Sequence, residues 1–135
     1  MAFDHRRLPT EALTFLAERH LATLTTMRAD GTAHVVPIGF SWDGECGIAR
    51  IITSRRSRKV AHLAASPRVA LCQVDGGRWL TLEGVADVTD DPERVAEAVR
   101  RYAERYRTPR PNPERVAVEV TVDRVLGRAA TPVSR

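Results

Sequence analysis

Hydroxyl and basic side chains are concentrated in one short stretch of this 135-residue sequence, TSRRSRK at residues 53–59. Thr53 and Ser54 offer hydroxyl groups there, Arg55, Arg56 and Arg58 offer guanidinium groups, and Lys59 offers an ammonium group. Lys59 is the only lysine, so every other residue in the Lys plus Arg total of 21 is an arginine. Guanidinium and ammonium groups bind phosphate and carboxylate oxygens through charge-assisted hydrogen bonds. The stretch therefore predicts a site for an oxyanion.

This basic stretch lies between an expected strand and an expected helix. The β-branched run at residues 48–54 predicts a strand that ends at Ser54. Val60, Leu63 and Ala64 recur at helical spacing and predict a helix from Ser57 to just before Pro67. Free backbone N–H groups at a helix start favour an anion, whereas each cation there costs up to about 1 kcal/mol. A bound phosphate would offset that cost, and the alternative is a solvated turn in an arginine-rich chain.

Hydrophobic patterning predicts the elements that position this stretch. The further expected strands cover residues 20–28, 32–42, 68–76, 78–90 and 115–127, and the expected helices cover residues 10–19, with Thr10 as N-cap, and 91–106. Six strands joined mostly by hairpins leave exposed edges unless the sheet curls on itself. We therefore expect a mainly β fold, an antiparallel barrel with flanking α-helices, built as a single domain over residues 1–135.

Two further groups of residues could meet a planar ligand. Gln73 and Trp79 flank one short turn, and an amide and an aromatic ring beside an anion site suit a heteroaromatic ring with a phosphate tail. Packing in the core or in a dimer is the alternative for Trp79. Pro37 removes a ladder hydrogen bond, which predicts a sheet edge or a bulge, and with Val36 and Ile38 it could lie against the ligand.

Several classes of protein are disfavoured by composition. No apolar run of 18 residues is present and the N-terminus lacks a signal-peptide core, so we expect a cytoplasmic protein without a membrane span. Cys46 and Cys72 have no metal-ligand spacing, which predicts free thiols and no metal. Neither GxSxG nor HExxH occurs, so hydrolysis is not indicated.

The net charge of +4 suits either nucleic acid or a phosphorylated or carboxylated small ligand. Aromatic residues make up only 5% of the chain, and most fall at apolar-periodic positions. Stacking on bases requires exposed aromatic rings along a basic groove. The sequence therefore favours a small-molecule ligand and no nucleic-acid partner.

Three long segments carry a resemblance to a known family. They are HLATLTTMRADGTAHVVPIGFSWD, ARIITSRRSRKVAHLAASPRVALCQVDGGRWLTLEGVADV and RYAERYRTPRPNPERVAVEVTVDRVLG. Together they resemble the split β-barrel flavin and deazaflavin oxidoreductases of the pyridoxamine 5'-phosphate oxidase-like superfamily. Through QVDGGRWLTLEG and RYRTPRPNP the chain is most similar to the actinobacterial branch that uses coenzyme F420, and there to the F420-dependent biliverdin reductases.

The resemblance implies a homodimer with two cofactor sites at the interface, each built from both subunits. It implies that Val36, Pro37 and Ile38 face the deazaflavin ring. The residues that it implies for the cofactor phosphate are Thr53, Ser54, Arg55, Ser57, Arg58 and Lys59. Gln73 and Trp79 would approach from the partner subunit, and Arg78 is a candidate for the cofactor tail or the substrate. Which of Arg55, Arg56 and Arg58 touch phosphate stays open, because this chain has SRRSRK where relatives often have Gly.

The implied activity is hydride transfer from reduced F420 to a conjugated acceptor, biliverdin or a related tetrapyrrole. Such chemistry belongs to the cofactor, so no catalytic side chain is required by the pattern. One alternative keeps the fold and uses FMN, as in a pyridoxamine phosphate oxidase-like enzyme. The other is a non-catalytic protein that binds F420 or a tetrapyrrole.

Overall fold

The computed structural model describes residues 2–130, so residue 1 and residues 131–135 of the expected domain lie outside the described part. The strands are β1 (Ala2–Phe3), β2 (Ala22–Met27), β3 (Ala33–Ile38), β4 (Ser41–Asp43), β5 (Ile48–Ser54), β6 (Arg68–Asp75), β7 (Arg78–Thr89) and β8 (Arg115–Arg128). The helices are α1 (Thr10–Ala17), α2 (Arg58–Ala65) and α3 (Pro92–Arg105). The mainly β class with flanking helices is confirmed.

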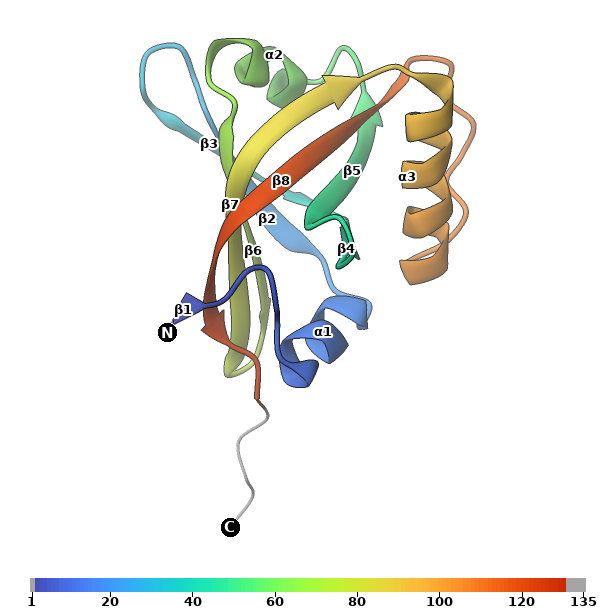
Figure 1. Ribbon diagram of the computed structural model, residues 1–135. Coiled ribbons are helices and arrows are strands. Elements are labelled where there is room, and N and C mark those ends of the chain that lie inside the picture. Colours follow the sequence, from blue (N-terminus) through green and yellow to red (C-terminus); the bar gives the residue numbers. More distant parts are fainter. Residues whose placement is uncertain (1, 131–135) are drawn as a thin grey trace.

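The strands form one antiparallel sheet in the order β3-β2-β6-β7-β8-β5-β4, with β1 added beside β8. Figure 1 shows this sheet strongly curved, with α2 and α1 near its opposite ends and α3 alongside β5. β3 ends the sheet order, so Pro37 lies on an edge strand, which is one of the two positions expected for it. An edge tolerates proline because the missing N–H is not needed by a second neighbour.

The sheet has eight strands where about six were expected, for two reasons. β1 is only two residues long, too short to give a pattern. The expected strand 32–42 is divided into β3 and β4, which pair with β2 and β5 at the two ends of the sheet order. The chain crosses between those ends at Gly39 and Phe40. A Cβ atom on Gly39 would lie 3.0 Å from the ring of Tyr106, so this crossing is closely packed.

The core follows the predicted alternation. Val116, Val118, Val120 and Val122 of β8 are all buried. A bulge then changes the register opposite Glu83 and Gly84, and from there Val125 takes the inward position. A Cβ on Gly84 would lie 2.1 Å from the carbonyl oxygen of Thr121, so only glycine allows the two backbones to approach this closely.

Helix starts agree with the sequence except at α1. Asp91 caps α3 and accepts a hydrogen bond from the Arg94 N–H at 3.0 Å, with Pro92 as the first helical residue. Ser57 precedes α2 as its N-cap. The expected cap Thr10 is wrong, since Pro9 holds that position and Thr10 is already helical. No helix within residues 2–130 has the length and apolarity needed to cross a membrane.

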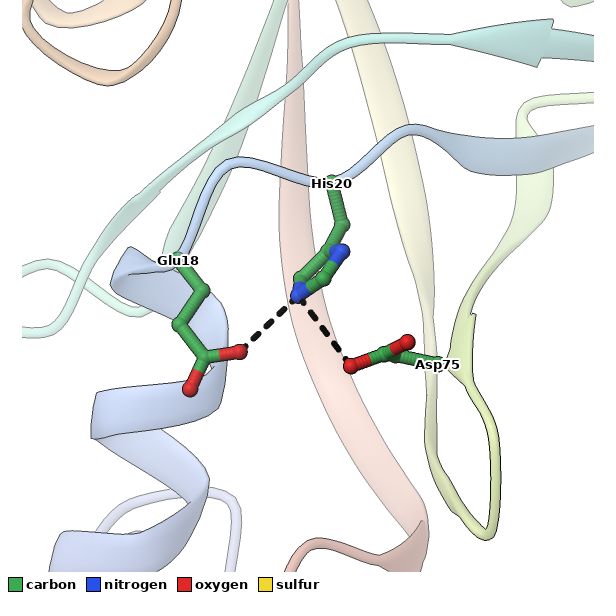
Figure 2. Close-up of side chains that lie close together, drawn as sticks. All are labelled: Glu18, His20 and Asp75. Atoms are coloured by element: carbon green, nitrogen blue, oxygen red, sulfur yellow. Dashed lines mark hydrogen bonds and ion pairs between the residues drawn. The ribbon is translucent and has the colours of Figure 1, made fainter.

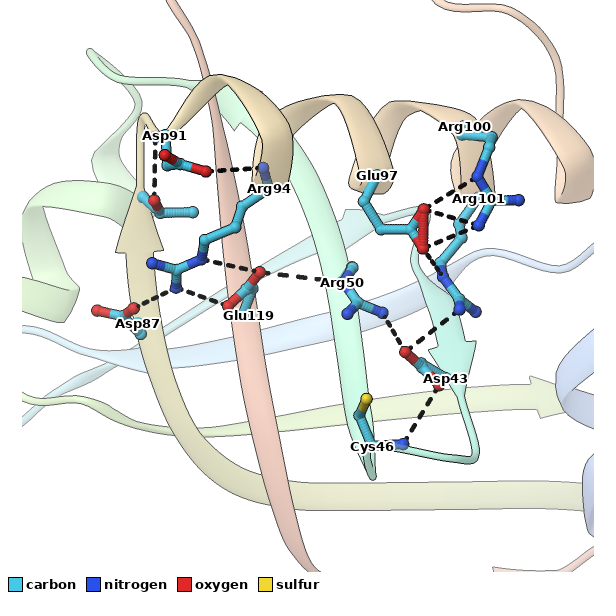
Figure 3. A network of polar contacts seen from close by, with 11 residues as sticks. Asp43, Cys46, Arg50, Asp87, Asp91, Arg94, Glu97, Arg100, Arg101 and Glu119 are labelled. Carbon is cyan, nitrogen blue, oxygen red and sulfur yellow. Dashed lines mark hydrogen bonds and ion pairs between the residues drawn. The ribbon is translucent and has the colours of Figure 1, made fainter.

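A chain of ion pairs holds α3 against the sheet (Figure 3). Arg94 joins Asp87 of β7 and Glu119 of β8, at 2.7 and 2.6 Å. Farther along, buried Asp43 accepts a hydrogen bond from Arg50 at 2.8 Å and lies 3.3 Å from Arg101. Burial opposes ionisation of Asp43, but the Arg50 hydrogen bond and backbone N–H contacts outweigh it and lower its pKa. The network therefore fixes the helix whose C-terminal half borders the candidate site.

Candidate functional site

Part of the basic stretch lines a cavity of about 250 Å³, here called the Lys59 cavity. Its polar lining residues are Thr53, Ser54, Lys59, Tyr102, Asn112 and Arg115, and Ile38, Gly39, Ile52 and Pro109 complete the wall. Thr53, Ser54, Lys59 and Ile38 were predicted from the sequence to bind a ligand. The structure therefore brings the end of β5, the start of α2 and the edge strand β3 to one place.

Strand register explains this convergence. β5 pairs with β8 so that Ser54 lies opposite Arg115 and Thr53 opposite Val116. The loop before β8 carries Asn112, whose side-chain oxygen accepts from the Glu114 N–H at 2.9 Å and whose carbonyl accepts from the Arg115 N–H at 3.1 Å. These bonds fix Asn112 while leaving its amide NH₂ as a possible donor. Lys59 enters from the first turn of α2.

The Lys59 cavity is electropositive. Lys59 and Arg115 both line it, and no carboxylate among the described residues does so. The Arg115 guanidinium donates to the Arg110 carbonyl, a neutral partner. Burial lowers the pKa of Lys59 because the ammonium loses hydration without gaining an ion-pair partner within residues 2–130. An oxyanion in this cavity would restore that lost stabilisation, so the residues present suit a phosphate group.

The remaining residues of the basic stretch take different places. Arg55 pairs with Glu114, with 2.9 Å between Nε and the carboxylate. Arg58 points into another cavity, lined also by Arg28 and His34. The Ser57 hydroxyl is buried and has no hydrogen-bond partner among the described residues. An unsatisfied buried hydroxyl at the start of α2 is a further feature that a bound anion would explain.

The three residues expected to face the ring lie on the edge strand. Val36 and Ile38 are half-buried, and Pro37 is exposed. Of the three, Ile38 reaches the wall of the Lys59 cavity. A planar group whose phosphate occupied that cavity could extend along β3, whose outer edge has no strand neighbour in the described sheet.

Gln73 is not available to a ligand, which corrects the expectation from the sequence. Its side chain is 1% exposed and points into the barrel. The amide NH₂ donates to the Phe15 carbonyl at 2.8 Å, and the amide oxygen accepts from Arg105 at 2.6 Å. Arg105 also donates to the carbonyls of Glu18 and Phe40. Gln73 therefore links α1 to α3 by hydrogen bonds within the core, and the role of its amide group is structural.

Arg78 is likewise held by partners in its own chain. It forms two hydrogen bonds to Glu18, at 2.9 and 2.8 Å, and one to Asp75 at 2.7 Å. Figure 2 shows the two carboxylates on either side of His20, whose Nε2 lies 2.9 Å from Glu18 and 3.8 Å from Asp75. The Arg78 bonds lower the pKa of Glu18 to about 2. Both carboxylates thus pair with one guanidinium group, and the arrangement is an ion-pair cluster.

Trp79 lies in a separate, mostly apolar cavity of about 240 Å³ that also contains Phe3, Pro9 and Ala129. Its side chain is 37% exposed. Within one chain the structure therefore separates Trp79 from the Lys59 cavity, and only a second subunit could bring such a residue to the site.

Three polar lining residues, Tyr102, Asn112 and Arg115, were not predicted from the sequence as ligand contacts. Tyr102 falls within the expected helix at residues 91–106, which carries no ligand motif. Asn112 and Arg115 have no local motif, although Asn112 falls in RYRTPRPNP, which carried part of the resemblance. Only the pairing of β5 with β8 reveals their proximity to Lys59.

The amino-acid sequence matches the model of a known family. Residues 8–129 match the family model described as pyridoxamine 5'-phosphate oxidase, and the chain belongs to this family. The expected resemblance is thereby confirmed.

Individual proteins of known function or structure are also similar to this chain. An F420H(2)-dependent biliverdin reductase of Mycobacterium tuberculosis is 55% identical over 123 residues, which are 91% of this chain and 90% of that protein. A solved F420 reductase is 27% identical with a TM-score of 0.73, covering 88% of this chain and 98% of its own. A conserved hypothetical protein of M. tuberculosis has the same fold, with a TM-score of 0.79 at 23% identity and coverages of 96% and 92%.

Proposed function

We propose that this protein is an F420-dependent reductase that transfers a hydride from reduced F420 to biliverdin or a related tetrapyrrole. The observation that carries the proposal is the Lys59 cavity, in which two cations face a space without a carboxylate among the described residues. The 55% identity to an F420H(2)-dependent biliverdin reductase over 91% of the chain supports both the cofactor and the acceptor.

In this proposal the Lys59 cavity holds the cofactor phosphate. Lys59 and Arg115 supply charge, and Thr53, Ser54 and Asn112 supply directed hydrogen bonds. Ile38, with Val36 and Pro37 beside it, supports the ring along β3. The bound deazaflavin supplies the hydride, and the protein supplies binding and orientation. These residues bind the cofactor, and none of them is assigned a role as a general acid or base.

The proposal includes a homodimer in the cytoplasm. Val74, Trp79 and Val85 of β6 and β7 are exposed apolar side chains, with 59%, 37% and 42% of their surface accessible. Burying them against a second copy would remove apolar surface from water, at about 25 cal/mol per Å². Free Cys46 and Cys72 suit a reducing compartment.

FMN is the second candidate cofactor. It is favoured by the match to the pyridoxamine 5'-phosphate oxidase family, and its phosphate would suit the same cavity. A fluorescence titration of the purified protein with F420 and, in parallel, with FMN separates the two. We expect saturable F420 binding at micromolar or tighter affinity and weaker FMN binding. Preference for FMN would favour a flavin enzyme, and binding of neither would refute the assignment of the cavity.

A further inference from the structure

A second electropositive cavity lies on the other side of the α2 start, between α2 and the hairpin of β2 and β3. Its volume is about 540 Å³, and its lining includes Arg28, His34, Arg58 and His62, with Ala29 and Asp30 at the hairpin turn. We call it the histidine cavity. None of its lining residues lines the Lys59 cavity, so the two are separate sites.

The two histidines form a built pair at the wall of this cavity. Their rings are edge to face, with centroids 4.7 Å apart. Nδ1 of His62 is hydrogen-bonded to the hydroxyl of Thr26 at 3.1 Å, and Thr26 is completely buried. When Thr26 donates this bond, the His62 proton resides on Nε2. Nδ1 of His34 is buried and has no partner among the described residues. The two rings are therefore fixed in position, but the hydrogen-bonding capacity of His34 Nδ1 is unused among the described residues.

The two arginines of the histidine cavity also lack an ionic partner. Within residues 2–130, seven arginines form ion pairs: Arg50, Arg55, Arg68, Arg78, Arg94, Arg100 and Arg101. Arg28 instead donates to the Ala33 carbonyl at 2.7 Å and to the Thr32 hydroxyl at 3.3 Å, and Arg58 has no ion pair in the described chain. These bonds fix the Arg28 guanidinium with neutral acceptors and leave it without an ion pair in the described chain.

One carboxylate, Asp30, borders the histidine cavity. It accepts hydrogen bonds from the Thr32 N–H and hydroxyl, at 2.9 and 2.6 Å, which lower its pKa and keep it ionised. Against its single negative charge stand two guanidinium groups and two imidazoles that can each gain a proton. The lining is therefore net positive even when both histidines are neutral.

We propose that the histidine cavity is a carboxylate-binding site, in which Arg28 and Arg58 supply the charge and the His34–His62 pair supplies ring N–H donors. Two sources of carboxylate go with the proposed function, on which this part of the inference rests: the glutamate tail of F420 and the propionates of the tetrapyrrole acceptor. Both present the same group, and guanidinium ions bind it with paired hydrogen bonds.

Binding at this site is expected to depend on pH. Burial lowers the pKa of His34 first, and the positive charges of His62 and Arg28, and those of Lys59 and Arg58 from α2, lower it further. Asp30 is the opposing charge at the hairpin turn. A bound carboxylate reverses this balance and favours protonated His34. Affinity should therefore rise as the pH falls, with uptake of a proton on binding.

The first test does not depend on the proposed function. Succinate is titrated into the apo protein at pH 5.5 and pH 8 while the histidine rings are followed by long-range ¹H–¹⁵N NMR, with His5 and His20 as internal controls. We expect saturable shifts of His34 and His62 alone, at least fivefold tighter at pH 5.5, and at least tenfold weaker binding in Arg28→Gln. Arg56→Gln, which removes an exposed arginine outside the cavity, should bind as the wild type does. Absence of saturable shifts, or equal shifts at His5 and His20, would overturn the proposal.

The second test identifies the source of the carboxylate. The Kd for F420 and the KM for biliverdin are measured for Arg28→Gln and for Arg56→Gln. A rise in the F420 Kd alone in Arg28→Gln assigns the site to the cofactor tail, and a rise in the biliverdin KM alone assigns it to the acceptor. If neither constant changes, the site does not serve these ligands and this part of the proposal is refuted. Failure of wild-type protein to bind F420 would instead count against the proposed function, whatever succinate does.

Discussion

Lys59 and Arg115 line the same cavity, although one lies in the first turn of α2 and the other begins β8. Neither forms an ion pair with a carboxylate among residues 2–130. Two cations facing an unneutralised space are unfavourable unless an anion joins them. This relationship is the physical basis for placing a phosphate there.

Replacing Lys59 tests that placement directly. In Lys59→Ala the F420 affinity should fall about 10- to 100-fold, because a hydrogen bond to a charged group contributes about 1.5–3 kcal/mol. Fluorescence titration gives the Kd. Arg56→Ala is the matched control, since it removes one positive charge from an exposed neighbour outside the cavity. Equal, small losses in both variants would mean that Lys59 contributes only to the general charge.

Arg115 should act on the same phosphate as Lys59. Arg115→Gln is expected to weaken F420 binding about tenfold or more, because the shorter neutral side chain removes the charge-assisted bond. Two groups that bind one phosphate are coupled, so the effects in the double variant should not add. The double-mutant cycle is measured by the same titration. Strict additivity would indicate that the two residues contact different parts of the ligand.

Gln73 should affect stability and leave cofactor binding in place. In Gln73→Ala one Arg105 nitrogen loses its partner, and the Phe15 carbonyl keeps only the Glu18 N–H at 3.3 Å. Leaving one buried polar group unsatisfied costs about 1–3 kcal/mol, so the free energy of unfolding should fall by about 2 kcal/mol. Urea denaturation measures this change. A variant that has wild-type stability but does not bind F420 would show that Gln73 contacts the cofactor.

The Glu18 and Arg78 pair predicts a pH dependence of stability. The folded-state pKa of Glu18 is about 2, against an ordinary value of 4.5, because Arg78 and then His20 hydrogen-bond to its carboxylate. A lowered folded pKa stabilises the fold above pH 4.5, and this contribution disappears as the pH falls toward 2. Glu18 is partly exposed, so solvent screening limits the contribution to about 1 kcal/mol or less.

The measurement is the difference in the free energy of unfolding between wild type and Glu18→Gln at pH 6 and at pH 2.5. The wild type should be the more stable protein at pH 6, and the difference should shrink at pH 2.5. A difference that is the same at both pH values would show that the ion pair does not control the titration.

Elements with a strong local pattern were predicted well from the sequence. The β-branched run that ends at Ser54, the alternating valines of β8 and the Asp91-Pro92 start of α3 all appear where expected. Local chemistry determines these features, because strand alternation and helix capping depend on near neighbours. The division of the expected strand at Gly39 was not predicted. It depends on the pairing of β3 with β2 and of β4 with β5, which the local pattern does not show.

Of the residues in the candidate site, mainly those that are close together in the sequence were predicted. Thr53, Ser54 and Lys59 are close in sequence, and their chemistry is visible there. Asn112 and Arg115 join them through strand pairing, which no spacing reveals. Gln73 shows the opposite failure: an amide on a strand looks like a ligand contact, but its position on the inward face makes it a core hydrogen-bonding group.

Hydride transfer itself is the central claim, and one assay tests it most directly. Under anaerobic conditions, reduced F420 and biliverdin are mixed with the purified protein, and the return of oxidised F420 is followed together with the loss of biliverdin absorbance. The account predicts catalytic turnover with one F420 oxidised for each biliverdin consumed, and slower turnover at subsaturating F420 for Lys59→Ala than for Arg56→Ala. Protein that binds F420 yet oxidises none of it in the presence of biliverdin or any related tetrapyrrole would contradict the account.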